Sequence, residues 1–166
     1  MPYVSVVEQG HFKFVAKVNC NLGEMKILEY LHYKKQWNNH VIQLEGTCLL
    51  NLGLGILLPI YQPVWELMSN SKGQLGQFCQ LAEDLISELQ FLHSYLVTHH
   101  DIKLDNLVYS PEFGLQIIDF DVAVQLDKDT DMVNDIVGTE DYIAPKLEDN
   151  QGLSYSPLKA DLWSCG

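Results

Sequence analysis

A dense polar cluster interrupts two apolar stretches near the middle of the chain. Residues 99–106 include an acid at Asp101, a lysine at Lys103 and an amide at Asn106. The stretch before it predicts a long helix over residues 77–94, because apolar side chains recur at steps of three and four, at Phe78, Leu81, Leu85, Leu89 and Leu92. The two residues after it are apolar and typical of a strand. The cluster is therefore expected to be a loop fixed between two ordered elements.

A second acid emerges from an apolar run thirteen positions after Asn106. Residues 117–121 read Ile-Ile-Asp-Phe-Asp, which places Asp119 directly after two β-branched residues. Hard divalent cations prefer oxygen ligands, and proteins hold magnesium with one or two carboxylates plus the phosphates of a substrate. A further group must orient the hydroxyl that attacks a phosphate. Two acids and an amide on neighbouring loops therefore indicate a site for magnesium and a nucleotide.

These motifs resemble the signature of the eukaryotic protein kinase family. Asp101 is similar to the catalytic-loop acid, Asn106 to the second metal ligand, and Asp119 to the acid of the DFG motif. Residues 138–146, GTEDYIAPK, resemble the GTxxYxAPE end of the activation segment. Residues 161–166, DLWSCG, are similar to the DxWSxG opening of the helix beyond it. Four such motifs in this order are far more specific than any one alone.

The resemblance implies an α+β fold of the two-lobe protein kinase type. Residues 1–62 would form a partial small β lobe with one helix, and residues 63–166 the first part of the helical lobe. Together they would be a single partial domain, truncated at both ends relative to the family. Local patterns predict a hairpin over 4–7 and 12–18, a helix over 24–33, strands over 41–44 and 56–60, and a hairpin over 107–108 and 115–118.

The resemblance also implies transfer of the γ-phosphoryl group of ATP to Ser or Thr hydroxyls of a protein substrate. Lys103 and the Gly138-Thr139 pair look like the Ser/Thr class. Asp101 would orient the hydroxyl and accept its proton, and Lys103 would neutralise charge on the moving phosphoryl group. Asn106 and Asp119 would hold Mg²⁺. His99 would be a packing residue beside Phe120.

A nucleotide-binding lysine is expected in the first hairpin. Phe14-Val15-Ala16-Lys17 resembles the VAIK strand of the family, so Lys17 would contact the α and β phosphates. Such a lysine pairs with a helix glutamate. Glu24 is preferred because it begins a pattern similar to ExxIL, and Glu29 is the alternative because it lies farther from Lys17 and nearer the next strand.

Several positions depart from the family pattern. His100 stands where most relatives have an arginine that receives a phosphorylated loop, Asp121 replaces the DFG glycine, and Lys146 replaces the APE glutamate. No glycine-rich loop precedes the first hairpin, since Gly10 lies in its turn. These departures support an alternative function, a catalytically impaired pseudokinase or kinase fragment that acts as a binding module.

The charge pattern limits the kinds of molecule that the chain is expected to bind. The chain has ten lysines, no arginine and a formal net charge of -12, which argues against a nucleic-acid surface. Acids concentrate between residues 119 and 149, which would favour basic peptide substrates. No run is long and apolar enough to span a bilayer. The four cysteines are scattered without a CxxC pair and are expected to be reduced and mostly buried, as in an intracellular, cytoplasmic protein.

Overall fold

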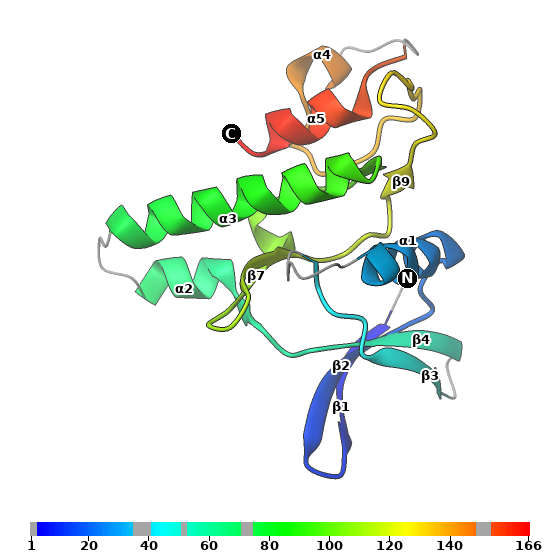
Figure 1. Ribbon diagram of the computed structural model, residues 1–166, viewed down its shortest axis with the longest axis vertical. Helices are drawn as coiled ribbons and strands as arrows, with labels where there is room; N and C mark the ends of the chain where they lie inside the picture. The colour runs from blue at the N-terminus through cyan, green and yellow to red at the C-terminus, as the bar shows by residue number, and fades with distance from the viewer. Residues whose placement is uncertain (1–2, 35–40, 51–52, 71–74, 149–153) are drawn as a thin grey trace.

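The computed structural model describes residues 3–34, 41–50, 53–70, 75–148 and 154–166. Its first part is an antiparallel sheet in the order β1-β2-β4-β3, with helix α1 inserted after the second strand. Figure 1 shows the β1–β2 hairpin at the end of the molecule opposite helices α4 and α5. The elements of this part are β1 (Tyr3–Gln9), β2 (Phe12–Val18), α1 (Leu22–Lys34), β3 (Gly46–Leu50) and β4 (Gly53–Leu58).

The predicted first hairpin is confirmed. Strands β1 and β2 pair from Tyr3–Val18 to Gln9–Phe12, and Gly10 in the turn has a φ of 62°, which glycine adopts without steric cost. The beginning of β2 is exposed, whereas its last three residues are buried where β2 also pairs with β4. Lys17 lies in this buried section, opposite Ile56. The sheet therefore brings a lysine into the interior.

The predicted first helix is also confirmed and begins with a defined cap. The Glu24 amide donates to Asn21 Oδ1 over 2.6 Å, so Asn21 is the N-cap of α1. The apolar residues that face the core are Met25, Ile27, Leu28 and Leu31. Glu24 lies on the same buried face, in the first turn of the helix. Burial of the apolar face thus fixes where the Glu24 carboxylate lies.

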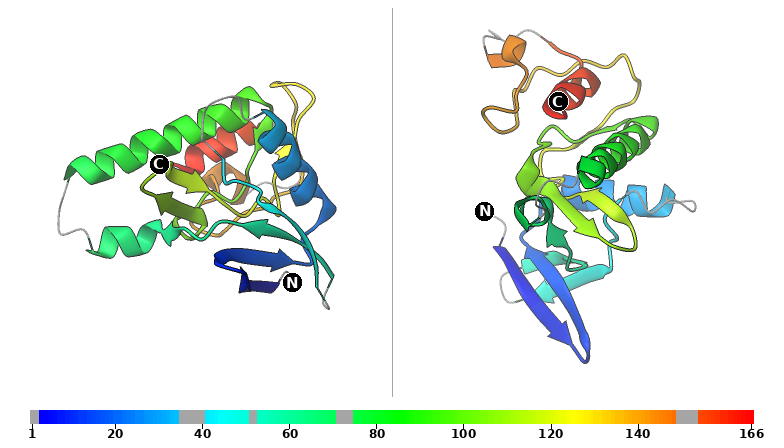
Figure 2. Two further views of the ribbon diagram at one scale, coloured as in Figure 1. Left: turned by 60° about the horizontal axis from the view of Figure 1, so that its bottom comes forward. Right: turned by 90° about the vertical axis from the view of Figure 1, so that its left-hand side faces the viewer.

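The second part of the chain is mostly helical. Helix α3 is the long helix that runs across the middle of the molecule in Figure 1, and the views in Figure 2 show α5 beside it. Two small antiparallel sheets have the orders β5-β7-β8 and β6-β9. The elements are β5 (Gln62–Pro63), α2 (Val64–Asn70), α3 (Leu75–Ser94), β6 (Val97–Thr98), the 3₁₀ turn η1 (Leu104–Asn106), β7 (Leu107–Ser110), β8 (Gly114–Ile117), β9 (Val124–Gln125), α4 (Pro145–Glu148) and α5 (Pro157–Ser164).

One apolar core joins the two parts. It contains Leu31 of α1, Ile56 of β4, Leu92 of α3 and Ile117 of β8, each fully buried. Burying one such side chain contributes about 1.5–3 kcal/mol. The core therefore holds the sheet that carries Lys17 against the β7–β8 hairpin beside the polar cluster. This architecture confirms the α+β expectation of a small β lobe with one helix followed by the first part of a helical lobe.

Some local predictions were wrong. Residues 41–44 are irregular, and the strand begins at Gly46, because the apolar run marks burial of Val41 and Ile42 and short apolar runs do not distinguish strand from buried loop. Strand β4 ends at Leu58, and α2 was not predicted. The last helix begins at Pro157, before the DLWSCG motif and not with it.

The cysteine prediction needs a correction as well. All four cysteines are free, but Cys79 is exposed and the other three are only partly buried. Among the described residues, no helix combines the length and apolarity that a membrane crossing requires.

Candidate active site

Lys17 forms the first centre of the site. Its ammonium lies 2.7 Å from Glu24 Oε1, 2.6 Å from Asp119 Oδ1 and 3.2 Å from Asp121 Oδ1. Its side chain is only 8% exposed. Strand β2 contributes the ammonium and helix α1 one carboxylate, and the turn after β8 contributes the other two carboxylates. Three carboxylates therefore share one buried ammonium.

The charges at this centre influence each other. Burial by itself lowers the pKa of Lys17, but hydrogen bonds to Asp119 and Glu24 outweigh that effect and raise it above its ordinary value. Burial raises the pKa of Glu24 to about 7; the Lys17 ammonium opposes this rise and Asp121 adds to it. Lys17 thus stays protonated, whereas burial favours the neutral form of the Glu24 carboxyl. The Glu24 Oε2 atom is buried without a hydrogen-bond partner.

Asp101 forms the second centre. Its Oδ2 atom accepts hydrogen bonds from Lys103 Nζ at 2.8 Å and Asn106 Nδ2 at 3.0 Å. Its Oδ1 atom accepts one from the Thr139 hydroxyl at 2.6 Å. Lys103 Nζ also donates to Thr139 Oγ1 over 2.8 Å, so lysine, threonine and aspartate form a closed set of contacts. Both carboxylate oxygens are held in a defined orientation.

This environment favours the ionised form of Asp101. Burial alone would raise its pKa, but Lys103, Thr139 and Asn106 together outweigh burial and hold the pKa below its ordinary value. Asp101 is only partly buried, so the group remains open to a ligand. A fixed, ionised and accessible carboxylate is able to orient a hydroxyl group and accept its proton.

Asp161 of α5 holds the loop that carries Asp101. It is fully buried and accepts hydrogen bonds from the His99 amide at 2.9 Å and the His100 amide at 2.7 Å. Its Oδ2 atom also lies 2.9 Å from His93 Nε2. His100 has a φ of 67°, a left-handed conformation that costs free energy in a non-glycine residue. The paired amide contacts stabilise the strained loop at the residue before Asp101.

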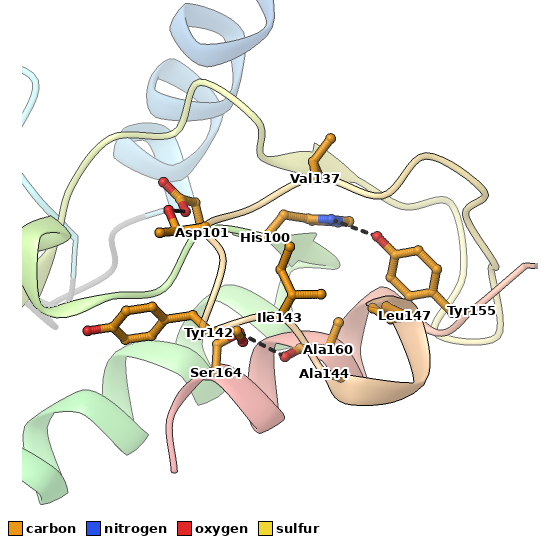
Figure 3. Close-up of a pocket in the computed structure, with 11 residues that line it drawn as sticks. His100, Asp101, Val137, Tyr142, Ile143, Ala144, Leu147, Tyr155, Ala160 and Ser164 are labelled. Carbon is orange, nitrogen blue, oxygen red and sulfur yellow. Dashed lines mark hydrogen bonds between the residues drawn. The ribbon is translucent and has the colours of Figure 1, made fainter. Parts of the chain in front are cut away.

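His99 and His100 have structural positions. His99 is fully buried against Phe120, with ring centroids 4.9 Å apart, as expected. His100 Nε2 lies 2.8 Å from Thr98 Oγ1, and Figure 3 shows its ring facing the Tyr155 hydroxyl, 3.5 Å from Nδ1. Burial lowers the pKa of both imidazoles. His100 is therefore neutral near pH 7 and occupied by internal contacts.

The two centres are joined through the backbone beside Asp119. The Ile118 amide donates to the Asn106 carbonyl over 2.9 Å, and the Ile118 carbonyl accepts from His99 Nε2 over 3.0 Å. Asn106 uses its side-chain nitrogen on Asp101, which leaves its amide oxygen for a ligand. An amide oxygen and the Asp119 carboxylate are donors of the kind that Mg²⁺ prefers. The residues present fit a magnesium ion beside the Lys17 ammonium.

The structure brings together the side chains proposed from sequence in two groups. Lys17, Glu24 and Asp119 meet at one centre, and Asp101, Lys103 and Asn106 at the other. Of the two candidate partners of Lys17, Glu24 makes the contact and Glu29 is exposed. The side chain of Lys146 lies outside the described residues.

Thr139 and Asp161 were not among the site residues expected from sequence. Both lie in recognised motifs, but their contacts reach residues 38 and 62 positions away, which no local pattern reports. Gly138 offered one signal. It has a φ of 120°, and a Cβ there would lie 2.7 Å from the His100 carbonyl, so the close approach that places Thr139 requires glycine.

Comparison with known proteins gives one family. The protein kinase domain family matches residues 13–166. The serine/threonine-protein kinase pakC of Dictyostelium discoideum is 34% identical over 164 residues, which cover 92% of this chain and 33% of that protein. "Probable serine/threonine-protein kinase CCRP1" of Zea mays is 41% identical over 153 residues, covering 90% of this chain and 22% of that protein. The chain thus spans about a third or less of the length of these relatives.

Proposed function

The chain belongs to the protein kinase domain family, and from this premise we propose that it transfers the γ-phosphoryl group of ATP to Ser or Thr hydroxyls of proteins. The observation that carries the proposal is the environment of Asp101. Lys103, Asn106 and Thr139 hold both of its carboxylate oxygens, and together they keep its pKa low.

We also propose that the small and large lobes divide near residue 62.

Each charged residue then has one role. Asp101 orients the substrate hydroxyl and accepts its proton, and Lys103 neutralises charge on the transferred phosphoryl group. Lys17, oriented by Glu24, binds the α and β phosphates. Asn106 and Asp119 would hold Mg²⁺, which when bound supplies positive charge to the phosphate oxygens. Phosphoryl transfer needs positioning and electrostatic stabilisation more than covalent participation by the protein, and these are what the two centres offer.

The surroundings of the site suggest the class of substrate. Asp127, Asp129, Asp135, Glu140 and Asp141 are all exposed on the segment between β9 and α4. Their charges would attract basic peptides and repel acidic ones. The four free cysteines suit a reducing compartment, and we propose a cytoplasmic location on that basis.

A specific observation favours the alternative, a binding module without catalysis. Asp121 contacts the Lys17 ammonium at 3.2 Å and would compete with phosphates for it. A chain that bound protein partners through the same fold, with a weakened nucleotide site, would show this arrangement. The two functions differ in whether phosphate is transferred.

The test is transfer of labelled phosphate from ATP to basic Ser/Thr peptides. Asp101→Asn should lower the rate about 10²–10⁴-fold, the usual contribution of a general base. The affinity for Mg-ATP should change little, because it comes from Lys17 and the metal ligands. Asp105→Asn, at an exposed position one residue before the end of the same polar cluster, is the matched control for charge removal.

The outcome separates the two candidates. Transfer by the wild-type chain that survives Asp105→Asn and is lost in Asp101→Asn supports the kinase. A folded wild-type chain that binds Mg-ATP but transfers no phosphate to any peptide would replace the kinase proposal with the binding module.

A further inference from the structure

Asn21 uses both ends of its side-chain amide to join two segments that are far apart in sequence. Its Oδ1 atom accepts the Glu24 amide at 2.6 Å and caps helix α1. Its Nδ2 atom donates to the Asp121 backbone carbonyl at 2.6 Å and lies 3.4 Å from Asp121 Oδ1. One planar amide thus connects the N-terminus of α1 to the turn after Asp119.

This connection spans the two acids that meet on Lys17. Glu24 lies three residues after Asn21 and is held by the cap, whereas Asp119 lies two residues before Asp121 and is held by the turn. Both carboxylates contact the Lys17 ammonium, at 2.7 and 2.6 Å. A shift of the turn away from α1 would separate Asp119 from Lys17 and Glu24.

The turn needs support because its backbone is strained. Asp119 has a φ of 69°, in the left-handed region that non-glycine residues adopt only when the surroundings enforce it. Position 121 is an aspartate and not a glycine, so it lacks the backbone freedom that would relieve the strain. On the N-terminal side of Asp119, the Ile118 amide donates to the Asn106 carbonyl and the Ile118 carbonyl accepts from His99 Nε2. On the C-terminal side, the bond from Asn21 to the Asp121 carbonyl is the corresponding contact.

The choice of asparagine separates this bridge from ordinary capping. Asn, Asp and Ser are about equally good N-caps, because a cap needs only a side-chain oxygen. Only asparagine combines that oxygen at the same distance with a donor that reaches the Asp121 carbonyl. Capping of the helix therefore accounts for the oxygen of the Asn21 amide, and the bond to the turn accounts for its nitrogen.

We propose that Asn21 is a positioning residue of the nucleotide site, whose amide holds the turn carrying Asp119 against helix α1 so that Glu24 and Asp119 are aligned on Lys17 together. This inference rests on the proposed kinase function for its catalytic consequence. Its structural part, the dependence of the turn on the amide nitrogen, stands independently of catalysis.

The test compares Asn21→Ser, which keeps a capping oxygen and removes the amide donor, with Asn21→Ala, which removes both. In Asn21→Ser, the melting temperature should fall less than in Asn21→Ala, because the cap remains. Hydrogen exchange at residues 119–123 should accelerate about fivefold, the factor expected for one ordinary hydrogen bond. In peptide phosphorylation, kcat/KM for ATP should fall by about the same factor, while KM for the peptide is unchanged. Asn21→Ala should add a lower melting temperature to these effects.

A second background tests which atom of Asp121 is involved. Because the short contact is to the backbone carbonyl, the Asn21→Ser effect on exchange should persist in an Asp121→Asn background. Wild-type exchange at 119–123 in Asn21→Ser would overturn the inference, as would equal effects of Asn21→Ser and Asn21→Ala on melting temperature. If the wild-type chain transfers no phosphate, the kinase proposal fails, and the exchange data alone still decide the role of Asn21.

Discussion

Replacing Asp121 by asparagine removes one of the three carboxylates on Lys17 and preserves the size of the side chain. The variant also preserves the backbone carbonyl that Asn21 contacts. The phosphates of ATP are negatively charged and need the same ammonium. We therefore expect Asp121→Asn to bind Mg-ATP more tightly than the wild type.

The magnitude follows from the geometry. Two unit charges at the observed 3.2 Å attract by about 1.3 kcal/mol in bulk water and about 5 kcal/mol at an effective dielectric constant of roughly 20. The Asp121 side chain is 29% exposed, and Lys17 keeps its bonds to Glu24 and Asp119, so the lower part of that interval applies. A gain of about 1–2 kcal/mol corresponds to a roughly 5- to 30-fold lower Kd for Mg-ATP.

Calorimetric titration with Mg-ATP measures this directly. Asp129→Asn is the matched control, since Asp129 is exposed on the segment beyond β9 and the same charge is removed there. It should change Kd by less than about twofold, because Asp129 is exposed to solvent and salt screens the interactions of exposed charges. Equal binding by wild type and Asp121→Asn would refute the competition argument. Weaker binding by the variant would show that Asp121 contributes more to holding the metal than it costs at Lys17.

The same variant has a consequence for the pH dependence of stability. Burial raises the folded-state pKa of Glu24 from 4.5 to about 7, with Asp121 among the causes. The stabilisation from a raised carboxyl pKa is fully present below pH 4.5 and is lost as the pH rises through 7, by at most about 3 kcal/mol. Asp121→Asn should make this loss smaller, as the free energies of unfolding in urea at pH 5 and pH 8 would show.

Two further predictions concern the nucleotide site and regulation. Mg-ATP at about 100 times its Kd should raise the melting temperature by roughly 5–10 °C, because binding then stabilises a domain of this size by about 2.7 kcal/mol. Lys17→Met should abolish the shift. A shift that survived this substitution would show that Lys17 is not part of the nucleotide site. Thr130→Glu should alter peptide phosphorylation by less than about twofold, because His100 is buried and neutral and the chain has no arginine to pair with the new charge; a tenfold gain would contradict this.

Local patterns in the sequence were sufficient for the elements that carry the site. Alternation and a turn glycine predict the β1–β2 hairpin, and three- and four-residue spacing predicts α1 and α3, because these signals depend on neighbours within a few positions. The resemblance of short motifs to the family identified most residues of the two centres, namely Lys17, Glu24, Asp101, Lys103, Asn106 and Asp119. The short helix α2 has too few turns for periodicity to reveal it, and the apolar run at 41–44 reports burial without a strand.

Contacts between segments that are distant in the chain could not be predicted from the sequence. Thr139 on Asp101, Asp161 under the His99–His100 loop, and the Asn21 bridge to Asp121 all depend on how separate elements pack. The resemblance identified Asp121 as the residue that replaces the DFG glycine and adds a charge near the expected metal site. In the folded chain its carboxylate is a third partner of Lys17, a role that the substitution itself does not report.

The two departures at the centre of the site have a common physical effect. At position 121 a residue with restricted backbone freedom replaces glycine, and its backbone and side chain both bind across to other elements, at Asn21 and Lys17. At position 100 a neutral, buried histidine replaces an arginine, and it contacts Thr98 and Tyr155 inside the protein. Tyr155 in turn donates to the Asp135 carbonyl over 2.9 Å and forms a two-way backbone bridge with Val133, which fastens the segment beyond β9. In the family pattern, a flexible glycine at position 121 and a phosphate-binding arginine at position 100 would permit switching. In this chain, the residues at both positions are held by fixed internal contacts. A chain built in this way would gain little from a phosphorylation switch, and its nucleotide affinity would be set by the competition among the acids on Lys17.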